Sequence, residues 1–440
     1  MTLTLSPDQQ HALNEVMDFL TDPDEHEMSL GGPAGTGKTF LTSVILKQAR
    51  KQAPMMQLLL NAKYELNVVL TSSTNKAAKV LSDATGEPAS TIHKKLSLRV
   101  YNDFKTGKTI LRRNPDSDVI KNTLVIIDEA SMINKDLLKT IRDLTMNCKV
   151  LYIGDPYQLA PVFENVSPVF NDVKKCVYLT TIQRQAAGNP IIGFSQQFRN
   201  ALDGNAFPAI NTLGTEIQHV SGNEFQLQID QAFNNMFDDN SARVIAWTNA
   251  RVHQLNSYVR HSIGCHTDYK VGEHLLTNQP ILDAKGRPIL NTDDIAEITA
   301  IQTSSKDDIN GWYIELNRGV KVFQAYNQAE VVAEIKSESK RNNEIKKANK
   351  YNEDNNLPPT GYTPNWSRYF SLKEEFADLR PIFACTANKA QGSTYGTVFI
   401  DLNDIAKCRK DSDIIRMLYT AITRAEHQVI MTGSLPARLY

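Results

Sequence analysis

A glycine-rich segment near the start of the chain is the first whose residue types and spacing suit chemistry. Residues Gly32 to Thr39 read GPAGTGKT, which satisfies the pattern GxxxxGK[ST]. The segment follows a short apolar stretch, Met28 to Leu30, and precedes an amphipathic run. Glycines let backbone N–H groups close around phosphate oxygens at the start of a helix, where the helix dipole favours an anion. The segment therefore predicts a site for nucleotide phosphates; a glycine-rich turn with a surface lysine is the alternative.

Within this loop we expect the contacts to divide between backbone and side chains. Lys38 is expected to reach the β- and γ-phosphate oxygens, and the Thr39 hydroxyl to ligate Mg²⁺. The predicted ATP-binding residues of the loop are Gly32, Pro33, Ala34, Gly35, Thr36, Gly37, Lys38 and Thr39.

Two adjacent carboxylates end a later apolar run, LVIIDEAS, from Leu124 to Ser131. A buried parallel strand delivers the side chains at its end to the carboxyl edge of the sheet, so both acids are expected to face the phosphate loop. Phosphoryl transfer needs one acid near the metal and, for hydrolysis, a group that activates or orients water. We therefore predict that Asp128 binds Mg²⁺ and that Glu129 acts on water. An isolated Asp-Glu pair would more often be a solvated turn.

A third segment, GDPYQLAPV from Gly154 to Val162, follows the apolar run VLYI. It offers Asp155 and Gln158 at the same sheet edge. The neutral amide of Gln158 is suited to contact the γ-phosphate or the attacking water, but it also suits a turn residue with satisfied hydrogen bonds. Residue type and spacing leave both readings open.

Short β-branched runs alternate with amphipathic stretches around these segments, which predicts βα units on a parallel sheet. A second α/β layer is predicted at Arg243 to Thr248, followed by a helix with Val252, Leu255 and Val259 on one face. Buried strands of the first layer are expected at Asn67 to Thr71, Thr123 to Asp128 and Lys149 to Gly154.

The stretch from Lys94 to Arg113 breaks this rhythm and predicts a β-hairpin. It holds seven basic residues against one acid, Asp103, with Tyr101 and Phe104 near the turn. Aromatic rings can replace lost base stacking at ~1–3 kcal/mol each while the cations follow phosphates, which suits a strand-separating pin. An exposed hairpin whose charges protect its edges from aggregation is the alternative.

The pattern changes to short alternating strands from Val271 to Ile335, which predicts a small all-β insert. A helix is expected over Glu334 to Tyr351, and the following LPPTGYTP should lack regular structure because of its prolines. Three large aromatic residues are candidates for docking or, as is more usual, for the core: Trp312, Trp366 and Phe370.

Composition limits the classes of function. The 48 Lys and Arg residues of the 440-residue chain nearly balance its 49 Asp and Glu residues, which excludes a basic polyelectrolyte and makes any nucleic-acid surface local. The five cysteines show no CxxC spacing, so neither a disulfide framework nor a zinc site is readable and a reducing compartment is favoured. The first residues do not resemble a signal peptide. We expect no membrane partner and a cytoplasmic location.

In combination and in order, GPAGTGKT, IIDEAS and GDPYQLAPV resemble the motifs of superfamily 1 DNA helicases. The resemblance is to the RecD-like branch, superfamily 1B, and within it to the Dda-type helicases of tailed phages; it covers nearly the whole chain. It implies an α/β fold with two RecA-like P-loop domains, a β-hairpin pin in the first and an SH3-like all-β insertion in the second. The implied parts are core 1 at residues 1–93 and 118–186, the pin at 94–117, core 2 at 187–270 and 380–440, and the β insert with its helical, proline-rich extension at 271–379.

The resemblance assigns further nucleotide contacts. Gln9, in LSPDQQHAL, is implied to recognise the adenine. Arg184, at the end of LTTIQR, and Arg424, in YTAITRA, are implied to reach the γ-phosphate from the second core, although each alone would more readily be a surface or ion-pair residue. The segment TANKAQGS is implied to couple the second core to ATP through Lys389, Gln391 and Gly392.

It also assigns contacts with the sugar–phosphate backbone of DNA. TSSTNKAAKVL and STIH imply contacts by Thr74 and His93, and TANKAQGS implies contacts by Thr386 and Ser393. A lone His93 would otherwise be a structural imidazole. The chain departs from the family at two positions, with Ser73 where a proline is usual and Asn388 where a histidine is usual.

We therefore expect an ATP-dependent DNA helicase that moves 5'→3' on single-stranded DNA and unwinds duplexes, driven by Mg-ATP hydrolysis between two cores. The expected partners are single-stranded and forked DNA, with a replication or single-strand-binding protein as a further candidate, and the expected state is monomeric. The alternatives are a translocase that displaces proteins without efficient unwinding, and a P-loop nucleotide kinase or switch ATPase that does not act on nucleic acid. A non-catalytic DNA-binding protein is disfavoured because Lys38, Thr39, Asp128, Glu129, Arg184 and Arg424 are all present.

Overall fold

The computed structural model describes residues 5–59, 67–161, 164–182, 189–234, 241–265, 268–283 and 287–440. The chain divides into two compact units. The first unit consists of Met1–Ser97, Pro115–Val259 and Phe383–Tyr440, and the second of Leu98–Asn114 and Arg260–Ile382. The four-part division implied by the family resemblance stays a prediction.

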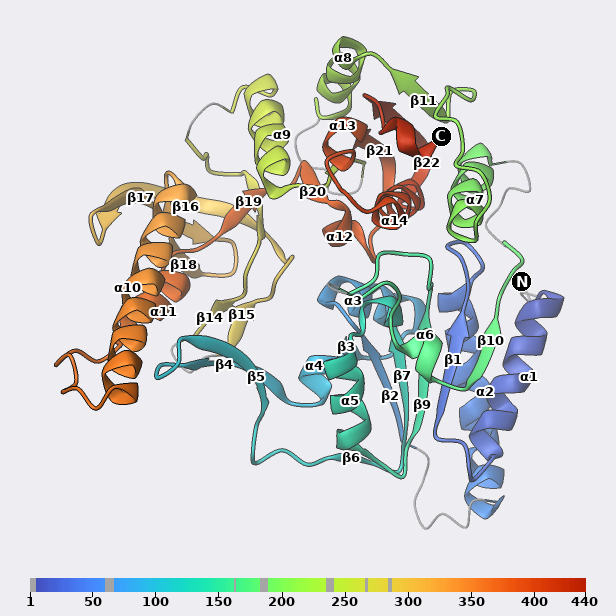
Figure 1. The fold of residues 1–440 in the computed structure, drawn as a ribbon. Helices are drawn as coiled ribbons and strands as arrows, with labels where there is room; N and C mark the ends of the chain where they lie inside the picture. Colours follow the sequence, from blue (N-terminus) through green and yellow to red (C-terminus); the bar gives the residue numbers. More distant parts are fainter. Residues whose placement is uncertain are drawn as a thin grey trace. The chain divides into compact units, whose positions relative to one another are not determined.

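The first unit contains a six-stranded parallel sheet with the order β10-β1-β9-β7-β2-β3 (Figure 1). Its central strands β7 and β9 are buried at every residue, which is why they read as continuous apolar runs instead of alternating ones. All three strands expected from the sequence are confirmed, and β2 extends one residue further. The strands are β1 (Glu27–Gly31), β2 (Asn67–Ser72), β3 (Ala89–Thr91), β7 (Thr123–Asp128), β9 (Lys149–Gly154) and β10 (Lys175–Tyr178).

Helices and short elements complete this half of the unit. The longer helices are α1 (Pro7–Thr21), α2 (Lys38–Leu59), α3 (Asn75–Thr85) and α5 (Lys135–Leu144). The short elements are α4 (Ile92–Lys95), β6 (Ile120–Lys121), η1 (Ala130–Met132), β8 (Thr145–Met146) and α6 (Val169–Asp172).

The same unit contains a five-stranded parallel sheet with the order β11-β22-β21-β12-β20. The predicted second α/β layer is confirmed, and the helix after β12 buries Val252, Leu255 and Val259 as its spacing indicated. The strands are β11 (Ile217–Val220), β12 (Ala242–Ala246), β20 (Ala384–Thr386), β21 (Tyr395–Asp401) and β22 (Ala425–Thr432). The helices are α7 (Pro190–Leu202), α8 (Gly222–Ala232), α9 (Asn249–Ser262), α12 (Ala387–Ala390), α13 (Leu402–Ile405), α14 (Asp411–Ile422) and η2 (Ala437–Leu439).

The second unit is built on a five-stranded antiparallel sheet with the order β18-β17-β16-β13-β19. The alternating strands expected in this region are therefore present, whereas the likeness to an SH3 domain stays a prediction. The strands are β13 (His274–Thr277), β14 (Ile281–Leu282), β15 (Pro288–Leu290), β16 (Ile295–Lys306), β17 (Ile309–Leu316), β18 (Val320–Ala325) and β19 (Leu379–Pro381).

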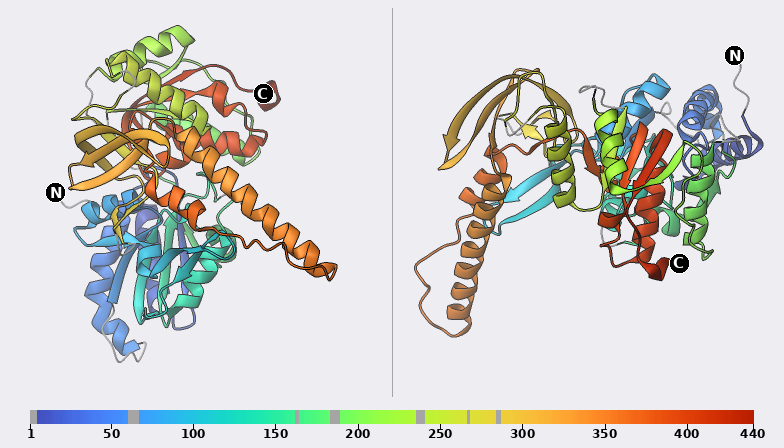
Figure 2. Two further views of the ribbon diagram at one scale, coloured as in Figure 1. Left: turned by 90° about the vertical axis from the view of Figure 1, so that its left-hand side faces the viewer. Right: turned by 90° about the horizontal axis from the view of Figure 1, so that it is seen from above.

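A long helix, α10 (Gln328–Asp354), leaves this sheet, and the chain then runs back along it to α11 (Ser367–Glu375) (Figure 2). The expected helix is confirmed and is longer at both ends. As the prolines predicted, the returning segment has no helix or strand, and asparagines fasten it instead. Asn349 donates to the Tyr362 carbonyl at 2.7 Å, and Asn342 donates to the Asn365 carbonyl at 3.1 Å.

The predicted hairpin is present as β4 (Leu98–Asp103) paired with β5 (Lys108–Arg113). Lys94 and Lys95, which the prediction placed in the hairpin, lie in α4. The Phe104 ring contacts the ring of Phe370 with their centroids 5.0 Å apart. The three aromatic residues proposed for docking or core are core residues, because Trp312, Trp366 and Phe370 are 6%, 3% and 1% exposed.

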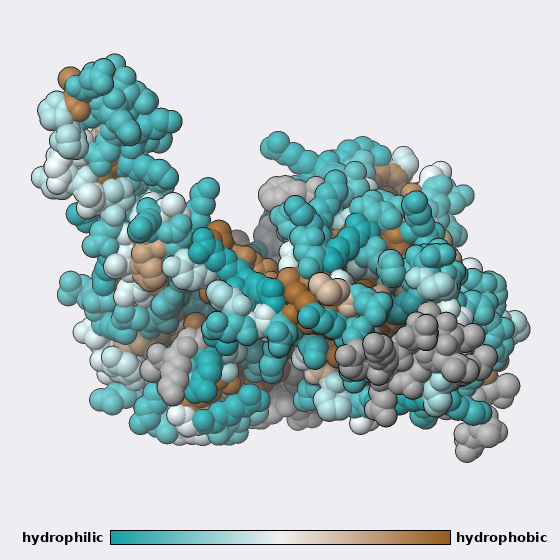
Figure 3. All heavy atoms as spheres, turned by 90° about the horizontal axis from the view of Figure 1, so that it is seen from below, coloured by the Kyte–Doolittle hydropathy of each residue, from teal (hydrophilic) through white to brown (hydrophobic). Residues whose placement is uncertain are grey.

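The face drawn in Figure 3 is mostly hydrophilic, and its apolar residues gather near the centre of the face and in smaller groups elsewhere. Among the described residues, none of the helices combines the length and apolar character that crossing a bilayer requires.

A glycine at the hairpin turn gives a prediction about packing within the second unit. Gly107 has φ +72°, and a Cβ added there would lie 2.3 Å from the Trp366 ring. Gly86, which follows α3, has the same φ of +72° but open space around it. We expect Gly86→Ala to lower the free energy of unfolding by about 1 kcal/mol from backbone strain. Gly107→Ala should cost about 1–3 kcal/mol more because of the collision.

Urea unfolding followed by circular dichroism and tryptophan fluorescence measures both variants. Equal losses of stability in the two variants would show that the turn does not pack on Trp366 in solution.

Candidate nucleotide and DNA site

Three segments predicted to act on nucleotide converge at the carboxyl edge of the six-stranded sheet. Strand β1 ends in the phosphate loop, its neighbour β9 ends at Gly154, and the next strand β7 ends at Asp128. Gly31 pairs with Gly154 in register, so the loop and the 154–159 turn start at the same level. The expectation drawn from buried parallel strands therefore holds for these segments.

The phosphate loop closes on its own lysine. The Lys38 ammonium donates to the carbonyl oxygens of Gly32 at 2.7 Å and Pro33 at 2.9 Å, which uses two of its three donors. Gly35 and Gly37 have φ of +84° and +79°, conformations that cost a residue with a Cβ free energy. The loop thus holds a cation at the start of α2, at the end of the helix whose dipole also attracts anions.

Gln9 connects α1 to this loop. It is 3% exposed, and its amide nitrogen donates to the Thr36 carbonyl at 2.9 Å. Its amide oxygen accepts from the backbone N–H of Ser6 at 3.1 Å, as part of the capping box that starts α1. The amide keeps one donor and one lone pair beyond these bonds, so adenine recognition by Gln9 stays a prediction.

Asp8 fixes the segment that leads from β10 toward Arg184. Its carboxylate accepts from the backbone N–H groups of Thr180 at 3.0 Å and Thr181 at 2.8 Å. Burial alone would raise the pKa of Asp8, but hydrogen bonds from Ser6, Thr181 and Thr180 lower it to about 2. Arg184 itself lies outside the described residues, and its role stays a prediction.

The acidic pair has unusual geometry and electrostatics. Asp128 is 9% exposed; burial and the nearby Glu129 carboxylate raise its pKa to about 7, although the Glu129 N–H and the Lys38 charge oppose this. Glu129 has φ +53°, a left-handed conformation that is costly for a residue with a side chain. The backbone N–H of Glu129 donates to Asp128 at 2.9 Å. A carboxyl group in this state gains from a nearby cation, because the cation favours its charged form.

Helix α14, which packs on the five-stranded sheet, forms hydrogen bonds with the turn after β9. Asp155, which is 0% exposed, accepts from the Tyr419 hydroxyl at 2.6 Å and from the backbone N–H of Tyr157 at 3.0 Å. Arg416 donates to the carbonyl oxygens of Pro156 at 2.5 Å and Gln158 at 3.0 Å. The two sheets therefore meet at the turn that carries Gln158, the residue predicted to contact the γ-phosphate or the attacking water.

Two more bonds hold the far end of this turn. The Leu159 N–H donates to the Thr420 hydroxyl at 3.2 Å, and Gln391 donates to the Leu159 carbonyl at 3.1 Å. The Leu159 side chain packs in the hydrophobic core of the five-stranded sheet. Gln391, implied to couple ATP to the second core, thus touches the turn directly. The coupling roles of Gly392 and Lys389 stay predictions.

Arg424 and Ser393 lie together at the amino edge of the five-stranded sheet. Arg424 donates to the Ser393 carbonyl at 3.2 Å, and its own carbonyl accepts from the Tyr395 N–H at 2.8 Å. Three buried polar atoms near the two-sheet junction have no hydrogen-bond partner among the described residues: Gln158 Oε1, Ser393 Oγ and Arg424 Nε. Buried polar atoms are usually hydrogen-bonded, so these three atoms keep unused hydrogen-bonding capacity.

The predicted DNA contacts occupy helix starts. The Thr74 hydroxyl caps α3 by accepting from the Ala77 N–H at 3.2 Å, and the Thr386 hydroxyl caps α12 by accepting from the Lys389 N–H at 3.3 Å. A Cβ added at Gly392 would lie 3.2 Å from that of Ala77, so the TANKAQGS segment lies against the start of α3.

The remaining predicted DNA residues differ in exposure. Burial lowers the pKa of His93, which favours a neutral imidazole. Ser393 is 2% exposed, whereas Tyr101 and Phe104 are 49% and 51% exposed. Contact with DNA by any of these four residues stays a prediction.

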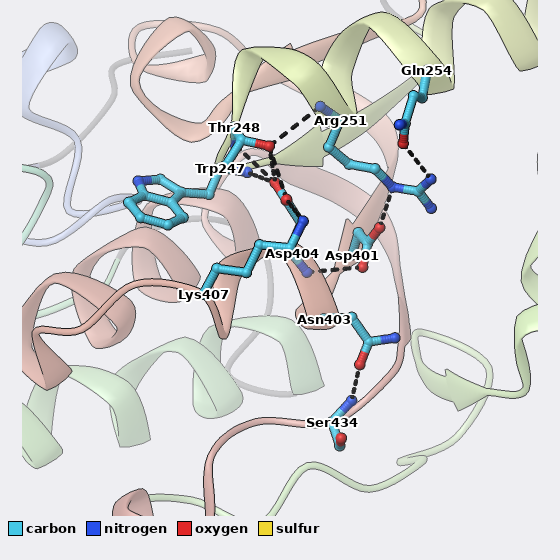
Figure 4. A network of polar contacts seen from close by, with 9 residues as sticks. All are labelled: Trp247, Thr248, Arg251, Gln254, Asp401, Asn403, Asp404, Lys407 and Ser434. Atoms are coloured by element: carbon cyan, nitrogen blue, oxygen red, sulfur yellow. Dashed lines mark hydrogen bonds and ion pairs between the residues drawn. The ribbon is translucent and has the colours of Figure 1, made fainter.

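An acidic residue that the sequence analysis did not single out orders the carboxyl edge of the five-stranded sheet (Figure 4). Asp404, 1% exposed, accepts from the backbone N–H groups of Trp247 at 2.9 Å and Thr248 at 2.7 Å and from Lys407 at 2.7 Å. Strand β12, which Trp247 follows, pairs with β20, so this cluster lies beside Thr386. A cavity of about 680 Å³ opens nearby and is lined in part by Arg251 and Asp401; none of the residues predicted from the sequence lines it.

Sequence reasoning also missed Tyr419 and Arg416 as partners of the turn. Both lie in or just before YTAITRA, and Asp155 lies in GDPYQLAPV, so the motifs carried the residues but not their pairing. A sequence pattern shows which face of α14 is apolar; it does not show which polar atom crosses to another sheet.

Comparisons with known proteins agree with this geometry. Residues 4–215 match a family model described as an AAA domain, and residues 381–432 match the UvrD-like helicase C-terminal domain. The ATP-dependent DNA helicase dda of Enterobacteria phage T4 is 28% identical over 463 residues, covering 97% of this chain and 98% of that protein. The ATP-dependent RecD2 DNA helicase of Deinococcus radiodurans is 32% identical over 164 residues, 37% of this chain and 20% of that protein.

One solved structure supports the fold class. It concerns DNA unwinding at forked double-stranded DNA by two coordinating Pif1 helicases. The two chains are 16% identical in sequence, and the match covers 99% of this chain and 94% of the Pif1 chain with a TM-score of 0.51. The α/β fold with parallel sheets is thereby confirmed.

The Asp404 cluster gives a prediction about pH. Burial alone would raise the pKa of Asp404, but hydrogen bonds from Lys407, Thr248 and Trp247 lower it below its usual range. A carboxyl group whose pKa is lower in the folded state stabilises the protein above its unfolded pKa. We expect Asp404→Asn to lose about 1.5–3 kcal/mol of unfolding free energy at pH 7, because hydrogen bonds to a charged acceptor are lost. This deficit should shrink as the pH falls below about 4.

Denaturant unfolding at pH 7 and pH 3 measures the effect. Asp411→Asn is the control, because Asp411 forms an exposed ion pair with Arg438 at 2.7 Å that should be worth about 0–1 kcal/mol. A deficit of Asp404→Asn that did not change with pH would contradict the assignment.

Proposed function

We propose a working cycle for this chain on the premise that it belongs to the Dda- and Pif1-like branch of the superfamily 1B DNA helicases and is an ATP-dependent DNA helicase. In this cycle the chain moves 5'→3' along single-stranded DNA and separates forked duplexes. The direction rests on the resemblance to the RecD-like branch. The energy comes from hydrolysis of ATP bound at the loop of residues 32–39.

The nucleotide site would work through donors of the loop and two acids. Loop N–H groups and Lys38 bind the phosphates, and the lysine exchanges its bonds to two carbonyl oxygens for phosphate oxygens. The residues present fit a magnesium ion. The pKa of Asp128 is raised, and a nearby cation would lower it toward its usual value. Mg²⁺ in proteins is usually bound by one or two carboxylates together with phosphates and water. Asp128 and the Thr39 hydroxyl would hold it. Bound Mg²⁺ would neutralise charge on the β- and γ-phosphates.

Water attack and charge compensation fall to other residues of this chain. Glu129, whose conformation is set by the turn after β7, accepts a proton from or orients the attacking water. Gln158, whose Oε1 has no hydrogen-bond partner in the described part of the chain, contacts the γ-phosphate or the attacking water, and Arg184 and Arg424 compensate the γ-phosphate charge from the second core.

The DNA grip would use uncharged donors. The helix starts at Thr74 and Thr386 offer N–H groups that bind phosphate without reading sequence, and neutral His93 and Ser393 add hydrogen bonds. The hairpin carries exposed Tyr101 and Phe104 together with its basic residues, which suits separation of base pairs at a fork.

One observation carries this proposal above the others. The 155–159 turn, at the edge that holds the phosphate loop, is hydrogen-bonded to α14 and to Gln391, which lies within the second predicted DNA segment, TANKAQGS. A change at the phosphates can therefore move one DNA-contacting half relative to the other.

The decisive experiment is unwinding of duplexes with 5' or 3' single-stranded tails, with ATP and with or without Mg²⁺. We expect strand separation only from the 5' tail and only with Mg²⁺. Separation from the 3' tail would reverse the proposed direction. DNA-stimulated hydrolysis and protein displacement without strand separation would favour the translocase.

Substitution of the loop lysine tests the nucleotide site. Lys38→Ala should reduce DNA-stimulated ATP hydrolysis by at least about 10³-fold and abolish unwinding, because phosphate binding and charge compensation are lost together. The fold should persist, and the circular dichroism spectrum of the variant should match that of the unchanged protein. Ordinary turnover by this variant would contradict the site.

The predicted arginine finger separates binding from chemistry. Arg184→Ala should lose hydrolysis by about 10²–10³-fold while fluorescent ATP analogues still bind within a few-fold of the normal affinity. Arg438→Ala, which removes an exposed ion pair with Asp411, is the control and should hydrolyse ATP normally. An equal loss of nucleotide affinity in Arg184→Ala would argue against a finger.

A further inference from the structure

We propose that Trp247 is a stacking platform for a base of single-stranded DNA, held in place by the buried Asp404 carboxylate beside Thr386. The inference rests on the proposed function and adds to it a residue to which no role in DNA binding was assigned. It gives the five-stranded parallel sheet a contact with a base, whereas Thr386 and Ser393 are predicted to contact the sugar–phosphate backbone.

The first step is the exposure of the indole ring. Trp247 is 37% exposed, whereas the other two tryptophans of the chain, Trp312 and Trp366, are 6% and 3% exposed. Tryptophan is on average highly buried, because its ring carries a large apolar area. In Figure 4 the ring points away from Asp404 and out of the hydrogen-bonded cluster. The ring therefore offers apolar surface that a flat partner can cover.

The second step is the rigidity of the backbone that carries the ring. One carboxylate oxygen of Asp404 accepts from the N–H groups of Trp247 at 2.9 Å and Thr248 at 2.7 Å, and the other accepts from the Thr248 hydroxyl at 2.9 Å. Asp404 is 1% exposed, so a shift of this backbone would leave a buried charge without its donors. A fixed backbone and a side chain with two rotatable bonds lose little conformational entropy when the ring is covered.

The third step is the position of the ring at the sheet edge. Strand β12 pairs in parallel with β20, and Ala246 lies opposite Thr386. Neighbouring strands are about 4.8 Å apart, so Trp247, the next residue, lies beside the predicted backbone contact at Thr386. The Thr248 hydroxyl accepts from the Arg251 N–H at 3.2 Å at the start of α9, where the helix dipole favours phosphate. A strand held at this edge by its backbone brings its bases close to the indole.

The fourth step is the kind of contact that a moving protein can use. Every base has a flat π-face, so stacking on an aromatic ring tolerates any sequence. The indole is uncharged, so it adds affinity without another ion pair to a phosphate. Trp247 thus suits a strand that must be held at one step and released at the next.

The first test is the tryptophan fluorescence of the full chain during titration with oligo(dT). A stacked base quenches indole emission, and Trp247 is the exposed indole of the three. We expect saturating oligo(dT) to quench the emission, and Trp247→Phe to lose most of this quenching. Equal quenching in the unchanged protein and in Trp247→Phe would overturn the proposal.

The second test separates base stacking from a structural role by the anisotropy of labelled oligonucleotides. Trp247→Ala should bind oligo(dT) about 5- to 100-fold more weakly, as expected for the loss of one stacked base. Its affinity for an abasic oligonucleotide, which keeps the sugar–phosphate backbone and lacks bases, should change less than about twofold. The salt dependence of oligo(dT) binding should keep its slope, because the indole neutralises no phosphate. Equal losses with both oligonucleotides, or a shallower slope, would refute stacking.

Two matched controls accompany this measurement. Trp247→Phe keeps a ring that can stack, so it should bind oligo(dT) within about threefold of the unchanged protein. Leu227 is an exposed apolar residue of α8 with no predicted contact with DNA, and Leu227→Ala should bind normally. A loss in Leu227→Ala equal to that in Trp247→Ala would show that Trp247 has no specific role, and would overturn the proposal.

A double substitution tests the part assigned to Asp404. Asp404→Asn should weaken binding of oligo(dT), but it should add little to Trp247→Ala, because both changes act on the same ring. Independent losses would refute the positioning role of Asp404. If the unchanged protein did not bind oligo(dT), the proposed function would fail and this inference with it. Normal binding by both the unchanged protein and Trp247→Ala would overturn this inference alone.

Discussion

The turn of residues 155–159 is the constraint on which the arrangement depends. Parallel strands place their carboxyl ends at one edge, so the phosphate loop, the acidic pair and this turn gather without any special contact. Strand order within the first sheet does not determine where the second parallel sheet packs. It is held by Leu159, which packs in its hydrophobic core, and by buried hydrogen bonds from Arg416 and Tyr419. Buried polar bonds fix register more strictly than apolar packing does, because a small shift leaves them unpaired.

The same physics decides what the sequence could predict. Strands β7 and β9, the phosphate loop, the β4–β5 hairpin and helix α10 follow from local patterns, because apolar periodicity, turn residues and prolines act within a few residues. The ends of elements were less certain, since Lys94 and Lys95 fall in α4. The pairings of Asp404 with Trp247 and of Asp155 with Tyr419 join residues more than a hundred positions apart, and no local pattern encodes them.

The candidate site can also be recognised by features that lower the stability of the folded state. Glu129 is held in a left-handed conformation, Asp128 is buried beside it, and Gln158 Oε1 has no partner among the described residues. Each of these opposes folding, and proteins keep such features chiefly where a ligand or a reaction compensates them. Ser73, where the family usually has proline, is a similar case. Its buried hydroxyl has no hydrogen-bond partner among the described residues, and its N–H donates to the Asp128 carbonyl at 3.3 Å, a bond that proline could not form.

A motor must release each phosphate that it grips, which limits how strongly it can hold one. In the proposed cycle the contacts at Thr74 and Thr386 come from helix starts, and His93 is neutral, so none of them is an ion pair. Such contacts are individually weak and insensitive to sequence, and they break at small cost when the two halves move. In the same proposed cycle, the basic residues of the hairpin would attract DNA at the fork, while the chain as a whole stays near neutral. Attraction and stepping would then be separated onto different surfaces.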